Sequence, residues 1–217
     1  MAARGPRPAS LRAVLIDHGP APFAGVILTG GSSHRMGEDK CFLVHDGAPL
    51  VQRVADALGR AGASTVRCIG GDLDGLRSLG LAAQPDAHPG EGPLGAVVQV
   101  LDAAEPDELT AILAVDLLWP DPRAIATLVA AAAAEPADVV LPDSGGHLQV
   151  LHGVWRRSAM AHLRAEFQSG VRSLTAAIAG LVTVRSMQQA PTGFLDADTP
   201  EQLRYAGPDP KGRRGRQ

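Results

Sequence analysis

The sequence is poor in several features that mark particular classes of protein. Only 3% of its 217 residues are aromatic, which is too few for the stacked rings on which single-stranded nucleic acids bind. Its two cysteines, Cys41 and Cys68, cannot build a disulfide framework and belong to no C-x-x-C or zinc pattern. No apolar run approaches membrane-spanning length. We therefore expect a cytoplasmic protein with reduced, buried cysteines that binds neither nucleic acid nor membrane.

The overall balance of residues fits one globular domain. Hydrophobic residues make up 45% of the chain and charged residues 20%, and the net charge is −3. A near-neutral chain lacks the basic face of a dedicated nucleic-acid binder. Residues 1–22 contain four scattered prolines and no periodicity, which indicates a flexible leader. We expect the domain to cover 23–206 and the Pro-, Gly- and Arg-rich end, 207–217, to be disordered.

Apolar runs and helical periodicity alternate along the chain. The pattern predicts strands at 26–28, 65–69, 79–84, 109–115, 139–143, 148–155 and 181–184, and helices at 50–58, 97–101, 123–134, 159–168, 173–179 and 201–206. Residues 70–72 are expected as a loop. This alternation indicates an α/β domain with a mainly parallel sheet and helices on both faces. In such sheets ligands lie outside the carboxyl ends of the strands.

The first predicted strand leads directly into a loop of small residues, 29–33. Arg35 and Lys40 follow this loop and add two positive charges. Glycines allow backbone N–H groups to approach an anion closely, and the cations offset its charge. The segment therefore suits a phosphate cradle, although small-residue loops after strands are common. Its function depends on whether the chain also supplies acidic groups.

Asp116 is the best candidate for such an acid. It ends a strongly apolar strand, where a carboxylate fits the carboxyl edge of the sheet. Mg²⁺ binds carboxylate oxygens together with the phosphates of a substrate. The loops at Thr29, Asp86 and Asp116 all follow predicted strands and could meet at one edge, which would suit phosphoryl or nucleotidyl transfer. A helix N-cap is an equally good interpretation of Asp116 taken alone.

Two further aspartates, Asp196 and Asp198, precede Pro200 near the end of the chain. Pro200 fits the first turn of a helix, so capping by Asp198 or Thr199 is the favoured interpretation. The alternative is that one of the two aspartates is a second metal ligand.

In combination, these motifs resemble the molybdenum cofactor guanylyltransferases, the MobA-like nucleotidyltransferases. The family's opening signature, L-x-G-G-x-S-x-R-M-G-x-D-K, is complete at 28–40, and its G-x-P-L helix start is at 47–50. A Gly- and Pro-rich loop that opens with aspartate lies at 86–95, and the closing D-x-D-T-P-E-x-L lies at 196–203. The resemblance extends over about 24–206, most of the chain.

The resemblance implies a Rossmann-like, three-layer α/β/α domain that binds GTP with Mg²⁺. It also implies transfer of GMP to the phosphate of molybdopterin with release of pyrophosphate, in molybdenum cofactor biosynthesis. The molybdopterin phosphate would attack the α-phosphorus, so no side-chain nucleophile is needed. We expect a monomer or weak oligomer in transient contact with proteins that deliver the cofactor.

The motifs and this resemblance together assign roles to individual residues. Nucleotide-binding residues would be Leu28, Thr29, Gly30, Gly31, Ser32, Lys40, Asp86, Gly92, Pro93 and Leu94. The catalytic residues would be Arg35, Lys40 and Asp116. Asp116 and Asp198 would hold the metal.

Two departures from the family pattern leave alternatives open. The family commonly reads D-M-P after the metal strand, whereas this chain reads D-L-L-W-P at 116–120. Thr29 stands where alanine is usual. The alternatives are a related transferase that uses CTP, or a sugar or alcohol phosphate as acceptor, and a non-catalytic homologue that only binds a nucleotide.

Overall fold

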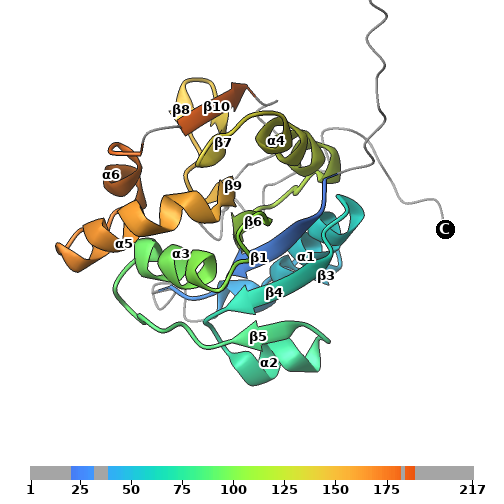
Figure 1. Cartoon of the computed structure of the whole chain (residues 1–217). Helices are drawn as coiled ribbons and strands as arrows, with labels where there is room; N and C mark the ends of the chain where they lie inside the picture. The colour runs from blue at the N-terminus through green and yellow to red at the C-terminus, as the bar shows by residue number, and fades with distance from the viewer. Residues whose placement is uncertain (1–20, 32–38, 182–183, 189–217) are drawn as a thin grey trace, which may run out of the picture.

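The fold is taken from a computed structural model that describes residues 21–31, 39–181 and 184–188 (Figure 1). Residues 1–20 of the leader predicted at 1–22, the helix 201–206 and the tail 207–217 lie outside the described residues. The predicted site residues Ser32, Arg35, Asp196 and Asp198 also lie outside the described residues. All of these assignments stay predictions. Within the described part, no helix combines the length and the apolar character needed to cross a bilayer.

An eight-stranded sheet forms the centre of the molecule, with the order β10-β7-β9-β6-β1-β4-β5 and with β8 paired to β7. Its strands are β1 (Phe23–Leu28), β4 (Thr65–Ile69), β5 (Ala82–Gln84), β6 (Leu109–Ala114), β7 (Val139–Ser144), β8 (His147–Leu148), β9 (His152–Arg156) and β10 (Val184–Gln188). Neighbouring strands are parallel from β6 through β1 and β4 to β5, and β10 is parallel to β7. β9 is antiparallel to both β6 and β7, so the sheet is mixed.

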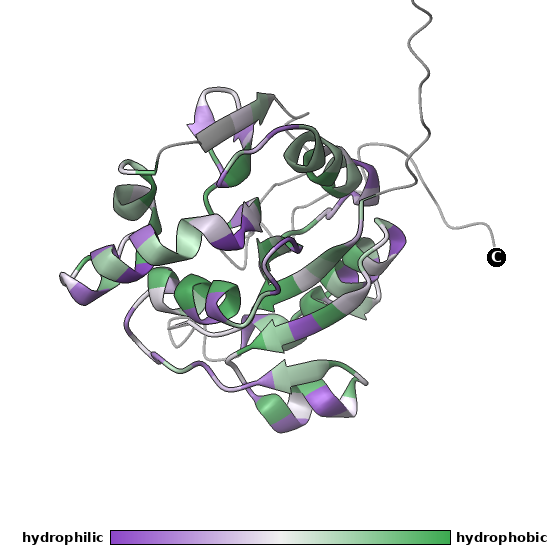
Figure 2. Cartoon of the chain, viewed as in Figure 1, coloured by the Kyte–Doolittle hydropathy of each residue, from purple (hydrophilic) through white to green (hydrophobic). Residues whose placement is uncertain are grey.

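The central strands are buried on both faces, as their continuous apolar sequences predict. Alternate side chains of β1 enter different clusters: Phe23 and Ile27 lie in one, and Val26 and Leu28 in the other. In Figure 2 the hydrophobic colour runs along β1 and β6. Two cores, one on each face of the sheet, therefore define three layers.

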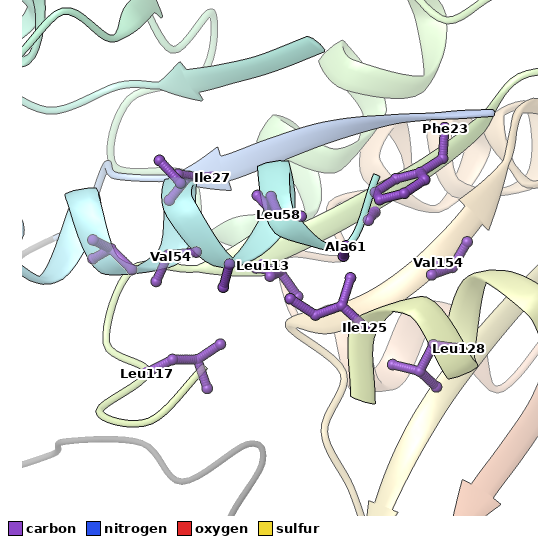
Figure 3. Close-up of a cluster of buried hydrophobic side chains, with 14 of the residues drawn as sticks. Phe23, Ile27, Val54, Leu58, Ala61, Leu113, Leu117, Ile125, Leu128 and Val154 are labelled. Carbon is purple, nitrogen blue, oxygen red and sulfur yellow. The ribbon is translucent and has the colours of Figure 1, made fainter. Parts of the chain in front are cut away.

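Helices cover both faces. The first cluster includes side chains of α1 (Leu50–Arg60), α2 (Leu73–Ser78) and α4 (Pro122–Ala134). The second includes those of α3 (Pro93–Asp102), α5 (Met160–Gln168) and α6 (Leu174–Ile178). In α1, Leu50, Val54 and Leu58 recur at helical spacing and are fully buried, and Figure 3 shows Val54 and Leu58 on this helix among the other buried side chains of the cluster. The expected α/β/α fold is confirmed.

Two 3-10 helices and a small hairpin complete the described chain. The 3-10 helices are η2 (Lys40–Phe42) and η3 (Arg157–Ala159). The hairpin pairs β2 (Val44–His45) with β3 (Ala48–Pro49) and leads directly into α1.

Several predicted boundaries were wrong. The single strand expected at 148–155 is two strands, because a turn closed by the His152 N–H on the Gln149 carbonyl interrupts it. The loop expected at 70–72 is confirmed, but helix α2 after it was not predicted; Asp72 caps this helix by accepting from the N–H groups of Asp74 and Gly75. β5 is shorter than the expected 79–84, and β10 begins later than the expected 181–184.

Both cysteines are buried in the first cluster, and neither forms a disulfide. Burial raises the pKa of the Cys68 thiol from 9.0 to about 11. Burial also raises the pKa of the Cys41 thiol well above its ordinary range, and the negative charge of Asp39 adds to the effect. The folded state therefore keeps both thiols protonated at pH values where unfolded thiols ionise.

We expect this difference to lower stability in alkaline solution. Between pH 9 and the folded-state pKa, the folded chain binds more protons than the unfolded chain, so stability falls as pH rises. For Cys68 the window runs from 9.0 to about 11, and the slope is about 1.4 kcal/mol per pH unit. Urea unfolding between pH 7.5 and 10.5 measures this change in the free energy of unfolding. Cys68→Ala should remove its share of the decline above pH 9 and leave the pH dependence below 8.5 unchanged; parallel curves would contradict the assignment.

Candidate functional site

The carboxyl ends of four parallel strands lie along one edge of the sheet. Leu28 of β1 is in register with Ile69 of β4 and with Ala114 of β6, so the three following loops start side by side. Ile69 is also in register with Gln84, the last residue of β5. The predicted meeting of the loops at Thr29, Asp86 and Asp116 is therefore a consequence of strand pairing.

The loops that follow β1 and β4 are bonded to each other. The N–H groups of Thr29 and Gly30 both donate to the Ile69 carbonyl, at 3.0 and 3.1 Å. The buried Thr29 hydroxyl is shared between the carbonyls of Ile69, at 3.0 Å, and Gly70, at 2.8 Å. The threonine that replaces the family's usual alanine thus ties the end of β1 to the end of β4.

Glycine is required where these loops cross. Gly70 has φ +81°, and a Cβ built on it would lie 2.9 Å from the Cα of Gly30. Such a contact is closer than real Cβ atoms approach a backbone. A Cβ on Gly30 would lie 3.6 Å from the Asp86 Oδ2 atom. The backbone of the loop after β1 therefore faces both the loop after β4 and the Asp86 carboxylate.

Asp86 is held by its own loop and by a side chain of α3. Its Oδ1 atom accepts from the N–H of His88 at 2.8 Å. The Gln99 amide accepts from the Ala87 N–H at 2.8 Å and donates to the Pro85 carbonyl at 2.9 Å, so it grips the backbone on both sides of Asp86. Sequence reasoning missed Gln99, although it is the single polar side chain between Pro93 and Leu101.

The rest of the Gly-rich loop packs against the end of α5. Gly92 has φ +83°, and a Cβ there would lie 3.0 Å from the Arg172 carbonyl oxygen. The Arg172 guanidinium pairs with Glu91 at 2.6 Å and lies 4.3 Å from the Phe167 ring centroid. Pro93 occupies the first turn of α3. Leu94 is fully buried in the second cluster, so it offers a ligand only its backbone.

Lys40 and Asp116 form an ion pair. The Lys40 Nζ lies 3.4 Å from the Asp116 Oδ2, and the two side chains keep 20% and 22% of their surface exposed. Lys40 begins η2, which Asp39 caps by accepting from the Cys41 N–H at 3.0 Å. The structure thus brings together two predicted site residues that lie far apart in the sequence.

Asp116 occupies a turn between two buried residues, Val115 and Leu117. Figure 3 shows the Leu117 side chain among the first cluster, on the loop that leaves β6. The N-cap of the next helix, α4, is Asp121, whose carboxylate accepts from the Arg123 N–H at 3.0 Å. The capping interpretation of Asp116 is therefore wrong, and its carboxylate is available to the site.

The chemistry of this donor set fits a magnesium ion only in combination with a substrate. In the described ranges, no group of three or more His, Cys, Asp or Glu side chains could hold a metal by itself. Mg²⁺ typically takes one or two carboxylates together with phosphate oxygens and water. A single partly exposed carboxylate beside a cation, as at Asp116, fits that mode of binding.

The comparisons with known proteins agree with this geometry. The MobA-like NTP transferase domain matches residues 25–184. A probable molybdenum cofactor guanylyltransferase of Chloroflexus aggregans is 32% identical over 197 residues, which cover 84% of this chain and 92% of the relative. The molybdenum cofactor guanylyltransferase of Rhodobacter capsulatus is 30% identical over 188 residues, covering 85% and 94%.

Solved structures share the fold. Molybdopterin-guanine dinucleotide biosynthesis protein A from Archaeoglobus fulgidus superposes with a TM-score of 0.71 at 18% identity, covering 85% of this chain and 96% of that one. A CMP:2-keto-3-deoxy-manno-octonic acid synthetase complexed with CTP gives 0.63 at 18% identity, covering 85% and 96%. At these identities the likeness concerns the fold alone.

We expect Gly70→Ala to destabilise the site far more than Gly47→Ala. Both glycines have positive φ, +81° and +82°, but a Cβ on Gly47 would meet nothing within 4 Å. Backbone strain alone costs about 1–2 kcal/mol, whereas Gly70→Ala must in addition displace Gly30. Urea unfolding should show at least about twice the loss for Gly70→Ala. Equal losses would mean that the crossing of the two loops is not a tight contact.

Proposed function

Because the chain belongs to the MobA-like NTP transferase family, we propose that it transfers GMP from GTP to the phosphate of molybdopterin and releases pyrophosphate. The observation that carries the proposal is the Lys40–Asp116 pair, at the sheet edge where the loop after β1 meets Asp86. Relatives at about 30% identity are molybdenum cofactor guanylyltransferases, which supports the choice of nucleotide and acceptor.

The reaction requires binding and charge neutralisation more than side-chain chemistry. An oxygen of the acceptor phosphate attacks the α-phosphorus of GTP, a new P–O bond forms, and the bond to the β-phosphate breaks. Negative charge then builds up on the leaving pyrophosphate. Lys40 and the predicted cation Arg35 would offset that charge, and the glycine-rich backbone after Thr29 would hold the nucleotide.

We propose that Asp116 would hold a Mg²⁺ ion together with the nucleotide phosphates, and Asp198 remains the expected second ligand. When bound, the ion supplies charge neutralisation between the phosphates. Asp116 holds its carboxylate at the sheet edge because Val115 and Leu117 are buried on either side of it. The ion pair with Lys40 keeps the cation and the carboxylate on the same side of the site. Delivery of the acceptor by a partner protein and a cytoplasmic location stay predictions.

We expect Asp116→Asn to lower pyrophosphate release from GTP and molybdopterin at least about 100-fold, because the amide keeps the shape but loses the charge. The measurement follows pyrophosphate in a coupled assay over a range of Mg²⁺ concentrations. Asp56→Asn is the matched control, because Asp56 is an exposed carboxylate on α1. Unchanged turnover in Asp116→Asn would refute the metal assignment.

We also expect GTP with Mg²⁺ to raise the melting temperature more than CTP, ATP or UTP. Ligand binding to the folded state raises its apparent stability, by about 2.7 kcal/mol at a concentration of 100 times Kd. A larger shift with CTP would favour a cytidylyltransferase. A GTP shift without transfer to any pterin or sugar phosphate acceptor would favour the non-catalytic alternative.

A further inference from the structure

One arginine bridges the two segments that carry the ion pair. Arg53 projects from α1, and its Nη1 donates to the His45 carbonyl at 3.2 Å. Its Nη2 donates to the Leu118 carbonyl at 3.1 Å. His45 lies in the hairpin that follows Lys40, and Leu118 lies in the loop just after Asp116. The single guanidinium therefore connects the backbone on the Lys40 side of the site with that on the Asp116 side.

The ring of Trp119 completes this bridge. The Arg53 Cζ lies 5.1 Å from the centroid of the indole, and the His45 ring meets the indole edge-on at 4.7 Å. Asp46 adds a weak ion pair at 3.8 Å. A planar guanidinium can donate to two carbonyls while it stacks on an aromatic face, and an ammonium group cannot. Only 17% of the Arg53 side chain is exposed, so the contacts are largely shielded from water.

The bridge involves the segment in which this chain departs from the family pattern. Between the aspartate and the proline of D-M-P there is one residue, whereas here Leu117, Leu118 and Trp119 stand between Asp116 and Pro120. Leu117 is buried in the core, and Leu118 and Trp119 contact Arg53. Each of the three residues between Asp116 and Pro120 is thus held in place by burial or by contact with Arg53.

We propose that Arg53 is a positioning residue that fixes the separation of Lys40 and Asp116, and that Trp119 senses ligand binding at Asp116. The inference rests on the proposed function, because that function assigns the ion pair to the triphosphate and its Mg²⁺. A ligand that binds the Asp116 carboxylate acts two residues from Leu118, whose carbonyl accepts from Arg53, and we expect it to change the surroundings of the adjoining indole.

The test combines kinetics with tryptophan fluorescence on the full chain. In Arg53→Met we expect kcat to fall about 10- to 100-fold while KM for GTP changes less than about threefold, because misplacement affects the transition state more than ground-state binding. Arg53→Lys keeps the charge and can donate to one carbonyl at a time, so its kcat should lie between those of the parent chain and Arg53→Met. Arg60→Met, an exposed arginine on the same helix, is the matched control and should retain full activity.

Fluorescence separates this inference from the proposed function. GTP with Mg²⁺ should change the emission of the parent chain and of Arg60→Met but not of Trp119→Phe, which keeps only the buried Trp155. The change should be reduced in Arg53→Lys and Arg53→Met. A chain without transferase activity that still shows this pattern would refute the proposed function and leave the coupling intact. Two results would overturn the inference. One is a tryptophan emission of the parent chain that does not change when GTP and Mg²⁺ are added. The other is an Arg53→Lys variant with unchanged kcat and unchanged Mg²⁺ dependence.

Discussion

The contact between the ends of β1 and β4 is the constraint on which the site depends. Thr29 and Gly30 bond the Ile69 carbonyl, and Gly70 lies so close to Gly30 that a Cβ on Gly70 would lie 2.9 Å from the Gly30 Cα. This contact directs the backbone after Thr29 toward Asp86. It also explains why threonine is suitable at a position where alanine is common, because the added hydroxyl of Thr29 is buried and bonds the carbonyls of Ile69 and Gly70.

Much of this arrangement could be predicted from the sequence because it follows from strand pairing. Lys40 and Asp116 are distant in the chain, yet each follows a strand whose carboxyl end reaches the same edge. The residues that hold the loops of the site in place could not be found in this way. Arg53 and Gln99 act on backbone carbonyls and N–H groups, which have no signature in the sequence. Ser32, Arg35 and Asp198, named in the sequence analysis, lie outside the described residues and stay predictions.

The errors in the fold have a similar physical origin. The run 148–155 is apolar throughout most of its length, so periodicity cannot reveal the turn that the His152 N–H closes on Gln149. Helix α2 has only six residues, too few to display a helical pattern, and its clearest signal is the capping carboxylate of Asp72. Both segments are controlled by local backbone hydrogen bonds, whereas the correctly predicted elements are controlled by burial.

The loop from Asp116 to Asp121 shows how one segment serves two needs. An aspartate near the start of a helix would normally satisfy the free N–H groups there, and its charge would then be committed to the helix. In this loop Asp121 caps α4, so the Asp116 carboxylate stays available to Lys40 and to a ligand. The separation requires additional residues between the two aspartates, and such residues would otherwise add conformational freedom beside the site. Burial of Leu117 and the contacts of Arg53 with Leu118 and Trp119 remove that freedom, which makes the longer loop compatible with a fixed carboxylate.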